Sequence, residues 1–169
     1  MTFVLGGAAS GKSQWAESYL LSSDLAPTYI ATSRNFDDEI NFRIIVHKSR
    51  RSERWLNCEA DSDLGLVLSQ CSGDQGVLID CATMWLTNQL MDENDLETAQ
   101  SKLLQDLALS AAPVVIVSNE VGQGIVPDNA LSRQFREAQG RLNIALAAQA
   151  DLAVQVIAGL PLVLKGQMP

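Results

Sequence analysis

Eight residues near the start of the chain have the spacing of a phosphate-binding loop. They match the pattern G-x-x-x-x-G-K-S/T and are Gly6, Gly7, Ala8, Ala9, Ser10, Gly11, Lys12 and Ser13. Glycines let the backbone curl so that successive N–H groups point at phosphate oxygens, and the helix expected to begin near Gly11 adds its positive end. Lys12 is expected to reach the β- and γ-phosphates, and the Ser13 hydroxyl to bind Mg²⁺. The pattern therefore predicts a site for a nucleoside triphosphate.

A carboxylate that would belong to the same site follows the apolar run 77–79. Asp80 stands at the carboxyl end of this expected strand, where parallel sheets deliver their ligands. There it would coordinate Mg²⁺ directly or through water, together with Ser13. The alternative is an aspartate that caps the following helix, a role for which Thr83 would compete. The spacing favours metal binding.

The chain has one histidine, His47, and it lies in a dense basic segment of an otherwise acidic protein. The cations of that segment are Lys48, Arg50, Arg51 and Arg54. Such a cluster can clamp an anion, and a neutral imidazole among phosphates can attack phosphorus as a nucleophile. A basic helix face exposed to solvent explains the same residues equally well. The residues alone leave both interpretations open.

The bulk composition limits the class of protein. The 169 residues are 47% hydrophobic and 19% charged, which is ordinary for a globular chain. The formal charge of −8 argues against general nucleic-acid binding. Three widely spaced cysteines without a CxxC pair predict neither a zinc site nor a disulfide framework. Without a leader pattern or a long apolar run, we expect a cytoplasmic protein with no membrane span.

Short apolar runs alternate along the chain with longer amphipathic stretches, as in a parallel sheet between helices. We expect strands at 3–5, 28–31, 77–79, 114–117, 152–157 and 162–164, and helices at 12–21, 37–50, 96–109 and 130–148. No repeat or linker divides them. The predicted fold is a three-layer α/β fold, with a single domain over residues 1–169.

Taken together, these residues resemble the bifunctional adenosylcobinamide kinase / adenosylcobinamide-phosphate guanylyltransferase family of cobalamin biosynthesis. The resemblance runs nearly end to end, and its most distinctive block is 118–127, Ser-Asn-Glu-Val-Gly-Gln-Gly-Ile-Val-Pro. The phosphate loop, His47, and the later residues Arg136, Arg141 and Asn143 stand at the spacing of that family. The resemblance implies a RecA-like P-loop NTPase fold, with a mostly parallel sheet and helices on both faces.

The resemblance also implies two reactions. The first phosphorylates the hydroxyl of the aminopropanol arm of adenosylcobinamide with GTP or ATP. The second transfers GMP from GTP to adenosylcobinamide phosphate, which gives adenosylcobinamide-GDP and pyrophosphate. The GMP passes through a covalent intermediate on a histidine that matches His47, with Lys12 as the second catalytic residue. Some relatives carry out only the second reaction, and no residue of this chain decides between the two cases.

Further site residues follow from the resemblance. The nucleotide contacts of the family fall on the phosphate loop and on Thr32, Ser33, Arg34, Lys48, Ser49, Arg50, Arg51, Glu59 and Asp80. Glu59 could accept hydrogen bonds from guanine, or it could be a surface glutamate. Asn119 and Glu120 could sense the nucleotide or contact the corrinoid. The alternative is that they belong to a loop whose glycines simply permit an unusual backbone conformation. A homotrimer is also implied.

Two other functions fit parts of the sequence. A plain P-loop kinase of a small metabolite would use His47 without a covalent intermediate. A regulatory nucleotide-binding protein would have switch loops and no metabolic substrate, but the N/T-K-x-D guanine motif of GTPase switches is missing.

Overall fold

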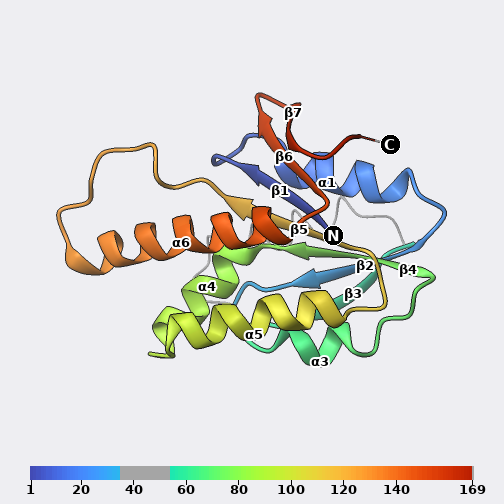
Figure 1. Ribbon diagram of the computed structural model, residues 1–169, viewed down its shortest axis with the longest axis horizontal. Coiled ribbons are helices and arrows are strands. Elements are labelled where there is room, and N and C mark those ends of the chain that lie inside the picture. The colour runs from blue at the N-terminus through green and yellow to red at the C-terminus, as the bar shows by residue number, and fades with distance from the viewer. Residues whose placement is uncertain (35–53, 169) are drawn as a thin grey trace.

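The computed structural model describes residues 1–34 and 54–168, which form a seven-stranded sheet with helices on both faces (Figure 1). The strands are β1 (Thr2–Gly6), β2 (Ala26–Ala31), β3 (Leu56–Glu59), β4 (Gln75–Asp80), β5 (Val114–Asn119), β6 (Leu152–Ile157) and β7 (Leu160–Lys165). The helices in these ranges are α1 (Lys12–Leu21), α3 (Leu64–Leu68), α4 (Ala82–Met91), α5 (Leu96–Leu109) and α6 (Ala130–Gln149).

The strand order is β3-β2-β4-β5-β1-β6-β7. All neighbouring strands are parallel except β6 and β7, which pair in antiparallel fashion. A turn at Ala158 and Gly159, both at positive φ, joins these two strands directly, so no crossover helix is needed. The order places β5 between β1 and β4, which brings the ends of these three strands to one edge of the sheet. The predicted three-layer, mostly parallel α/β fold is confirmed.

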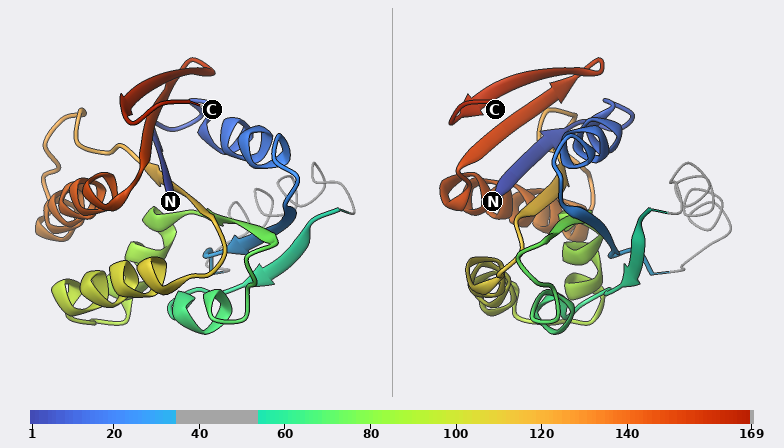
Figure 2. Two further views of the ribbon diagram at one scale, coloured as in Figure 1. Left: turned by 45° about the vertical axis from the view of Figure 1, so that its right-hand side comes forward. Right: turned by 90° about the vertical axis from the view of Figure 1, so that its right-hand side faces the viewer.

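The helices divide unequally between the two faces of the sheet (Figure 2). In the described part of the chain, α1 covers one face, where Ala16 and Leu20 pack against apolar residues of the central strands. Helices α3 to α6 cover the other face, where Leu142 and Leu146 are fully buried. Side chains along a strand alternate between these two cores, because successive residues point to opposite faces. This alternation decides which edge residues can meet at the phosphate loop.

The sequence predicted most elements closely. Helices 12–21 and 96–109 and strand 152–157 agree with the structure to the residue, and the other observed strands that were predicted differ by at most two residues at each end. The strand β3 and the helices α3 and α4 were not among the predicted ranges. The strand β3 and the helix α3 are short. Helix α4 buries polar residues such as Asn88, so its buried face does not appear in the sequence as a stripe of apolar residues. The predicted helix 37–50 lies outside the described residues.

Candidate active site at the carboxyl edge of the sheet

The phosphate loop leaves β1 at Gly6 and enters α1 at Lys12. Its backbone is held from two sides, since the Glu120 N–H donates to the Gly6 carbonyl at 3.0 Å and the Gly159 N–H donates to the Ser10 carbonyl at 2.8 Å. The φ of Gly11 is 90°, a left-handed conformation that glycine adopts without steric cost. The ends of β5 and β6 therefore fix the shape of the loop.

Two side chains of this loop differ in what they can offer to an anion. The Lys12 ammonium donates to the Gly7 carbonyl at 3.1 Å, which folds the side chain back over its own loop. The Ser10 hydroxyl is buried and has no hydrogen-bond partner among the described residues. A buried polar group without a partner is costly unless a ligand satisfies it. The loop therefore offers the Lys12 cation to phosphate oxygens, whereas the Ser10 hydroxyl lies against Gly6 inside the loop.

Asp80 ends β4 on the face of the sheet that α1 covers. Its carboxylate accepts a hydrogen bond from the Tyr29 hydroxyl at 3.1 Å, and Tyr29 belongs to the same core as α1. No side chain caps the start of α4. The Thr83 hydroxyl instead accepts a hydrogen bond from the Asn119 N–H at 2.8 Å. The capping alternative for Asp80 therefore has no support in the geometry.

The residues expected to bind Mg²⁺ are Ser13 in the first turn of α1 and Asp80 at the end of β4. A hydroxyl and a carboxylate are the hard oxygen donors that this ion prefers. Within the described ranges, no three histidine, cysteine or acidic side chains gather where they could hold a metal by themselves. Such a sparse donor set fits Mg²⁺, because this ion usually keeps several waters and shares its remaining positions with substrate phosphates.

The segment after β2 is tied to β4 through Thr32, which is fully buried. Its hydroxyl donates to the Cys81 carbonyl at 2.7 Å and accepts from the Cys81 N–H at 2.8 Å. The Asn88 amide of α4 donates to the carbonyls of Thr32 and Asp61, at 2.7 Å each. Both of these side chains therefore hold the backbone at the carboxyl edge, a role of Asn88 that no local sequence pattern indicates.

Arg34 uses its whole guanidinium group in ion pairs. Its Nε donates to Asp61 at 2.5 Å, and its two terminal nitrogens donate to Asp92 at 2.6 and 2.7 Å. These hydrogen bonds lower the pKa of both aspartates and raise the pKa of Arg34. Ser33, which precedes Arg34 in the chain, is half-buried. The arrangement connects the end of β2 to the loop after β3 and to the end of α4.

Glu59 ends the edge strand β3 and is exposed. Its register partner on β2 is Ala31, which in turn is the partner of Asp80. The predicted guanine contact therefore lies on the same edge as the phosphate loop. It is four strand spacings away from β1, or roughly 19 Å along the sheet.

The residues expected to carry out nucleotidyl transfer lie outside the described ranges. They are His47, Lys48, Ser49, Arg50 and Arg51. The described chain reaches this segment from Arg34, at the carboxyl edge of the sheet, and continues after it at Arg54. The role of these residues stays a prediction.

The Cys81 thiol, next to Asp80 at this edge, is not a ready nucleophile. All three thiols are free. Burial, followed by the nearby charge of Asp80, raises the pKa of the Cys81 thiol to about 11, so this thiol stays protonated at neutral pH. Burial also raises the pKa of Cys71. A nucleophile at this site would therefore be a group other than the Cys81 thiol.

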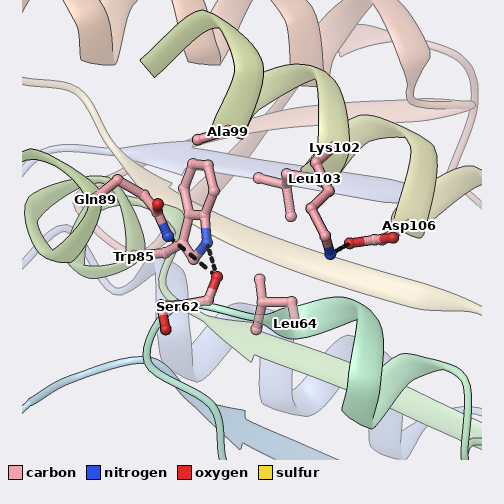
Figure 3. Close-up of a pocket in the computed structure, with 8 residues that line it drawn as sticks. All are labelled: Ser62, Leu64, Trp85, Gln89, Ala99, Lys102, Leu103 and Asp106. Atoms are coloured by element: carbon pink, nitrogen blue, oxygen red, sulfur yellow. Dashed lines mark hydrogen bonds and ion pairs between the residues drawn. The ribbon is translucent and has the colours of Figure 1, made fainter. Parts of the chain in front are cut away.

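A small cavity of about 40 Å³ lies between α3, α4 and α5, behind the loop that follows β3 (Figure 3). Trp85 and Gln89 of α4 both point at the Ser62 carbonyl and donate to it at 2.8 and 3.1 Å. Across the cavity, Lys102 donates to Asp106 at 2.7 Å. The space holds at most a water or two, so it is no substrate site. Its residues instead support the loop that carries Asp61.

Comparisons with known proteins agree with these observations. The model of a family described as cobinamide kinase / cobinamide phosphate guanyltransferase matches residues 2–164. A bifunctional adenosylcobalamin biosynthesis protein of Pseudomonas aeruginosa is 39% identical over 97% of this chain and 96% of its own length. Proteins of the same description from Salmonella typhimurium and Escherichia coli are 39% and 38% identical, each over 98% of this chain and 99% of the relative.

Solved structures support the fold at lower identity. The RadB recombinase matches with a TM-score of 0.51 and 18% identity, over 91% of this chain and 72% of the recombinase. A protein from Pyrococcus horikoshii OT3 matches with a TM-score of 0.59 and 8% identity, over 98% and 86% of the two chains. At such identities the likeness shows the RecA-like P-loop architecture alone. Among the described helices, none has the length and apolarity needed to cross a bilayer.

Proposed function

Since this chain belongs to the cobinamide kinase / cobinamide phosphate guanyltransferase family, we propose that it phosphorylates adenosylcobinamide and then transfers GMP from GTP to the product. The family and its bifunctional relatives indicate a transferase with both activities. The observation that carries the proposal is the phosphate loop at the carboxyl edge, beside Asp80, in a chain that resembles its bifunctional relatives over nearly its whole length.

In the first reaction, the substrate hydroxyl oxygen bonds to the γ-phosphorus of the triphosphate. The bond between this phosphorus and the β-phosphate oxygen breaks, a nucleoside diphosphate leaves, and the hydroxyl proton passes to solvent. The N–H groups of the loop and Lys12 stabilise charge on the phosphoryl oxygens. Ser13 and Asp80 would hold Mg²⁺, which adds positive charge between the phosphates.

In the second reaction, a nitrogen of His47 bonds to the α-phosphorus of GTP and pyrophosphate leaves. A phosphate oxygen of adenosylcobinamide phosphate then bonds to the same phosphorus, and the bond to His47 breaks. The products are adenosylcobinamide-GDP and free imidazole. A covalent intermediate of this kind splits one difficult displacement into two easier ones. Support comes from the family resemblance and from His47 being the single histidine of the chain.

The remaining nucleotide contacts are part of the same proposal. Glu59 accepts hydrogen bonds from the guanine N1–H and amino group, which would exclude adenine. The backbone of residues 32–34 and the basic segment 48–51 provide the other proposed contacts, since the Thr32 hydroxyl bonds to Cys81 and the Arg34 guanidinium bonds to Asp61 and Asp92. The cytoplasmic location expected from the sequence also stays a prediction.

The proposed assembly is a homotrimer, and β7 is its proposed contact with a second copy of the chain. Leu160, Leu162 and Leu164 of this edge strand are 71%, 52% and 52% exposed. With the neighbouring apolar side chains they expose on the order of 500 Å², more than half of what one partner contributes to a standard interface. We expect light scattering to give three times the mass of one chain. The variant Leu162→Asp should give a smaller mass, and an unchanged mass would rule out this surface.

Labelled GTP separates the possible activities. With adenosylcobinamide, label in the γ-phosphate should appear in adenosylcobinamide phosphate. With adenosylcobinamide phosphate, label in the α-phosphate should appear in adenosylcobinamide-GDP and label in the γ-phosphate in pyrophosphate. Transfer of γ-label alone would identify a plain kinase, and transfer of α-label alone a guanylyltransferase. Release of labelled phosphate without any labelled corrinoid would contradict the proposal.

A further inference from the structure

We propose that the tip of the loop between β5 and α6 binds the corrin ring of the substrate, through the side chains of Ile125 and Val126 and the open surface at Gly124. This inference rests on the proposed function and adds a corrinoid-binding surface to it. The loop leaves the same edge of the sheet as the phosphate loop (Figure 1). It therefore lies where a substrate that reacts with the bound triphosphate has to arrive.

The tip of this loop is apolar and exposed. Ile125 is 96% exposed, more than any other large apolar side chain in ranges 1–34 and 54–168, and its neighbour Val126 is 63% exposed. A single exposed apolar side chain is ordinary on a protein surface. Here two β-branched side chains, which have few rotamers to lose, follow one another at the edge that carries the phosphate loop. Such a pair is suited to cover a flat apolar ligand.

The first end of the tip is tied to the phosphate loop through Glu120. The Glu120 N–H donates to the Gly6 carbonyl at 3.0 Å. The Glu120 carboxylate accepts hydrogen bonds from the N–H groups of Gly122 and Gln123 at 2.6 and 3.3 Å. One residue therefore connects the loop that is expected to hold the triphosphate to the loop that carries the apolar tip.

Helix α6 holds the tip on both sides. Arg136 donates to the Gly122 carbonyl, and Arg133 donates to the carbonyls of Pro127 and Asp128 at 3.0 and 2.7 Å. These hydrogen bonds fix the backbone before and after the tip. Little conformational entropy is therefore lost when a ligand covers it, which favours binding.

Gly124 is not required by the described chain itself. Its φ is not positive, and a Cβ at this position would meet no atom of the described residues within 4 Å. Alanine would therefore fit, and it would stabilise the folded state by reducing the freedom of the unfolded chain. A glycine in such a place agrees with close approach of a ligand to the backbone.

The corrinoid is the occupant that this position favours. Its reacting hydroxyl is joined to the ring by a short arm, so the ring has to lie close to the bound triphosphate. The faces of a corrin ring are largely hydrocarbon, and they can pack on branched aliphatic side chains. The proposed contact with a second copy of the chain lies elsewhere, on β7, three strand spacings or roughly 14 Å from β5 along the sheet.

The test measures both reactions in three variants. Ile125→Ser should raise KM for adenosylcobinamide and for its phosphate by about 10- to 30-fold, because most of one buried aliphatic side chain is lost. The kcat values and KM for GTP should stay within about 3-fold, since the ring is bound equally in the ground state and the transition state. Ile125→Leu should stay close to the wild type. Gly124→Ala should raise the two corrinoid KM values by about 5-fold without lowering Tm.

Equilibrium dialysis with adenosylcobinamide alone, followed by its visible absorbance, measures binding without turnover. Ile125→Ser should raise Kd by about 10- to 30-fold here as well. The controls are Leu109→Ser and Gly73→Ala, which lie before β5 and β4, at the opposite edge of the sheet. Leu109 is 76% exposed, and a Cβ at Gly73 would meet only the Ala111 carbonyl, at 3.6 Å. Both variants should match the wild type in affinity and in rates.

Unchanged corrinoid KM and Kd values in Ile125→Ser would overturn the inference. A smaller mass of Ile125→Ser in light scattering would show a contact between copies and overturn it as well. The same holds for a lowered Tm together with an equal rise in KM for GTP, which would show a structural role. If the wild type binds adenosylcobinamide but turns over neither corrinoid, the proposed function fails separately, and the dialysis result still decides the inference.

Discussion

Replacing His47 with alanine is expected to abolish guanylyl transfer while phosphorylation of adenosylcobinamide continues. The loss of the nucleophile should lower α-label transfer by at least about 1,000-fold, because no imidazole is left to form the covalent intermediate with GMP. Phosphorylation should stay within about 10-fold of the wild type, since the hydroxyl attacks the γ-phosphorus directly. Steady-state assays with the two labelled forms of GTP measure both rates on one preparation.

The variant His47→Gln serves as the companion to His47→Ala. Glutamine keeps hydrogen-bonding groups but cannot form a stable bond to phosphorus, so it should lose guanylyl transfer to the same extent. If either variant transfers GMP at close to the wild-type rate, His47 is not the nucleophile. In that case the plain-kinase interpretation of the phosphate loop, with a non-covalent histidine, becomes the better account.

Replacing Lys12 with alanine should damage both reactions, in contrast to the histidine variants. The Lys12 ammonium lies across the phosphate loop, 3.1 Å from the Gly7 carbonyl, and both reactions use the triphosphate that this loop holds. We expect a fall of about 100- to 1,000-fold in kcat/KM for phosphorylation and for guanylyl transfer. The Tm should change little, because within the described residues the Lys12 ammonium donates a hydrogen bond only to Gly7 of its own loop.

The variant Lys12→Arg gives the matched control for charge. Its guanidinium keeps the positive charge but has a planar shape that does not fit a site for a compact ammonium, so most of the activity should still be lost. A Lys12→Ala enzyme that retains one of the two activities would show that the reactions use separate triphosphate sites. That result would contradict the shared loop proposed here.

The phosphate loop and most of the sheet could be predicted because their signals are local. Residues 6–13 carry their spacing in one stretch of sequence, and each buried strand is a short apolar run. The antiparallel β7 was harder to place, since its direction depends on a tight turn at Ala158 and Gly159. The edge strand β3 has few apolar residues, so it has no strong pattern of its own.

The supports of the site could not be predicted, because they join residues that are distant in the chain. The ion pairs of Arg34 reach Asp61 and Asp92, and the Gly159 N–H holds the Ser10 carbonyl. Only the strand order brings these groups together. The hydrogen bonds that the Glu120 carboxylate accepts from the Gly122 and Gln123 N–H groups have no signal in the sequence either.

Trapping the covalent intermediate would identify the residue that carries the GMP. The wild-type enzyme should be incubated with α-labelled GTP and Mg²⁺ in the absence of cobinamide phosphate, then denatured and digested. We expect label on the single peptide that contains His47. Acid should release this label and base should not, as expected for a phosphorus–nitrogen bond. His47→Ala should acquire none. Label on another residue, or equal labelling of His47→Ala, would contradict the claim that GMP from the GTP bound in the shared phosphate loop is transferred to His47.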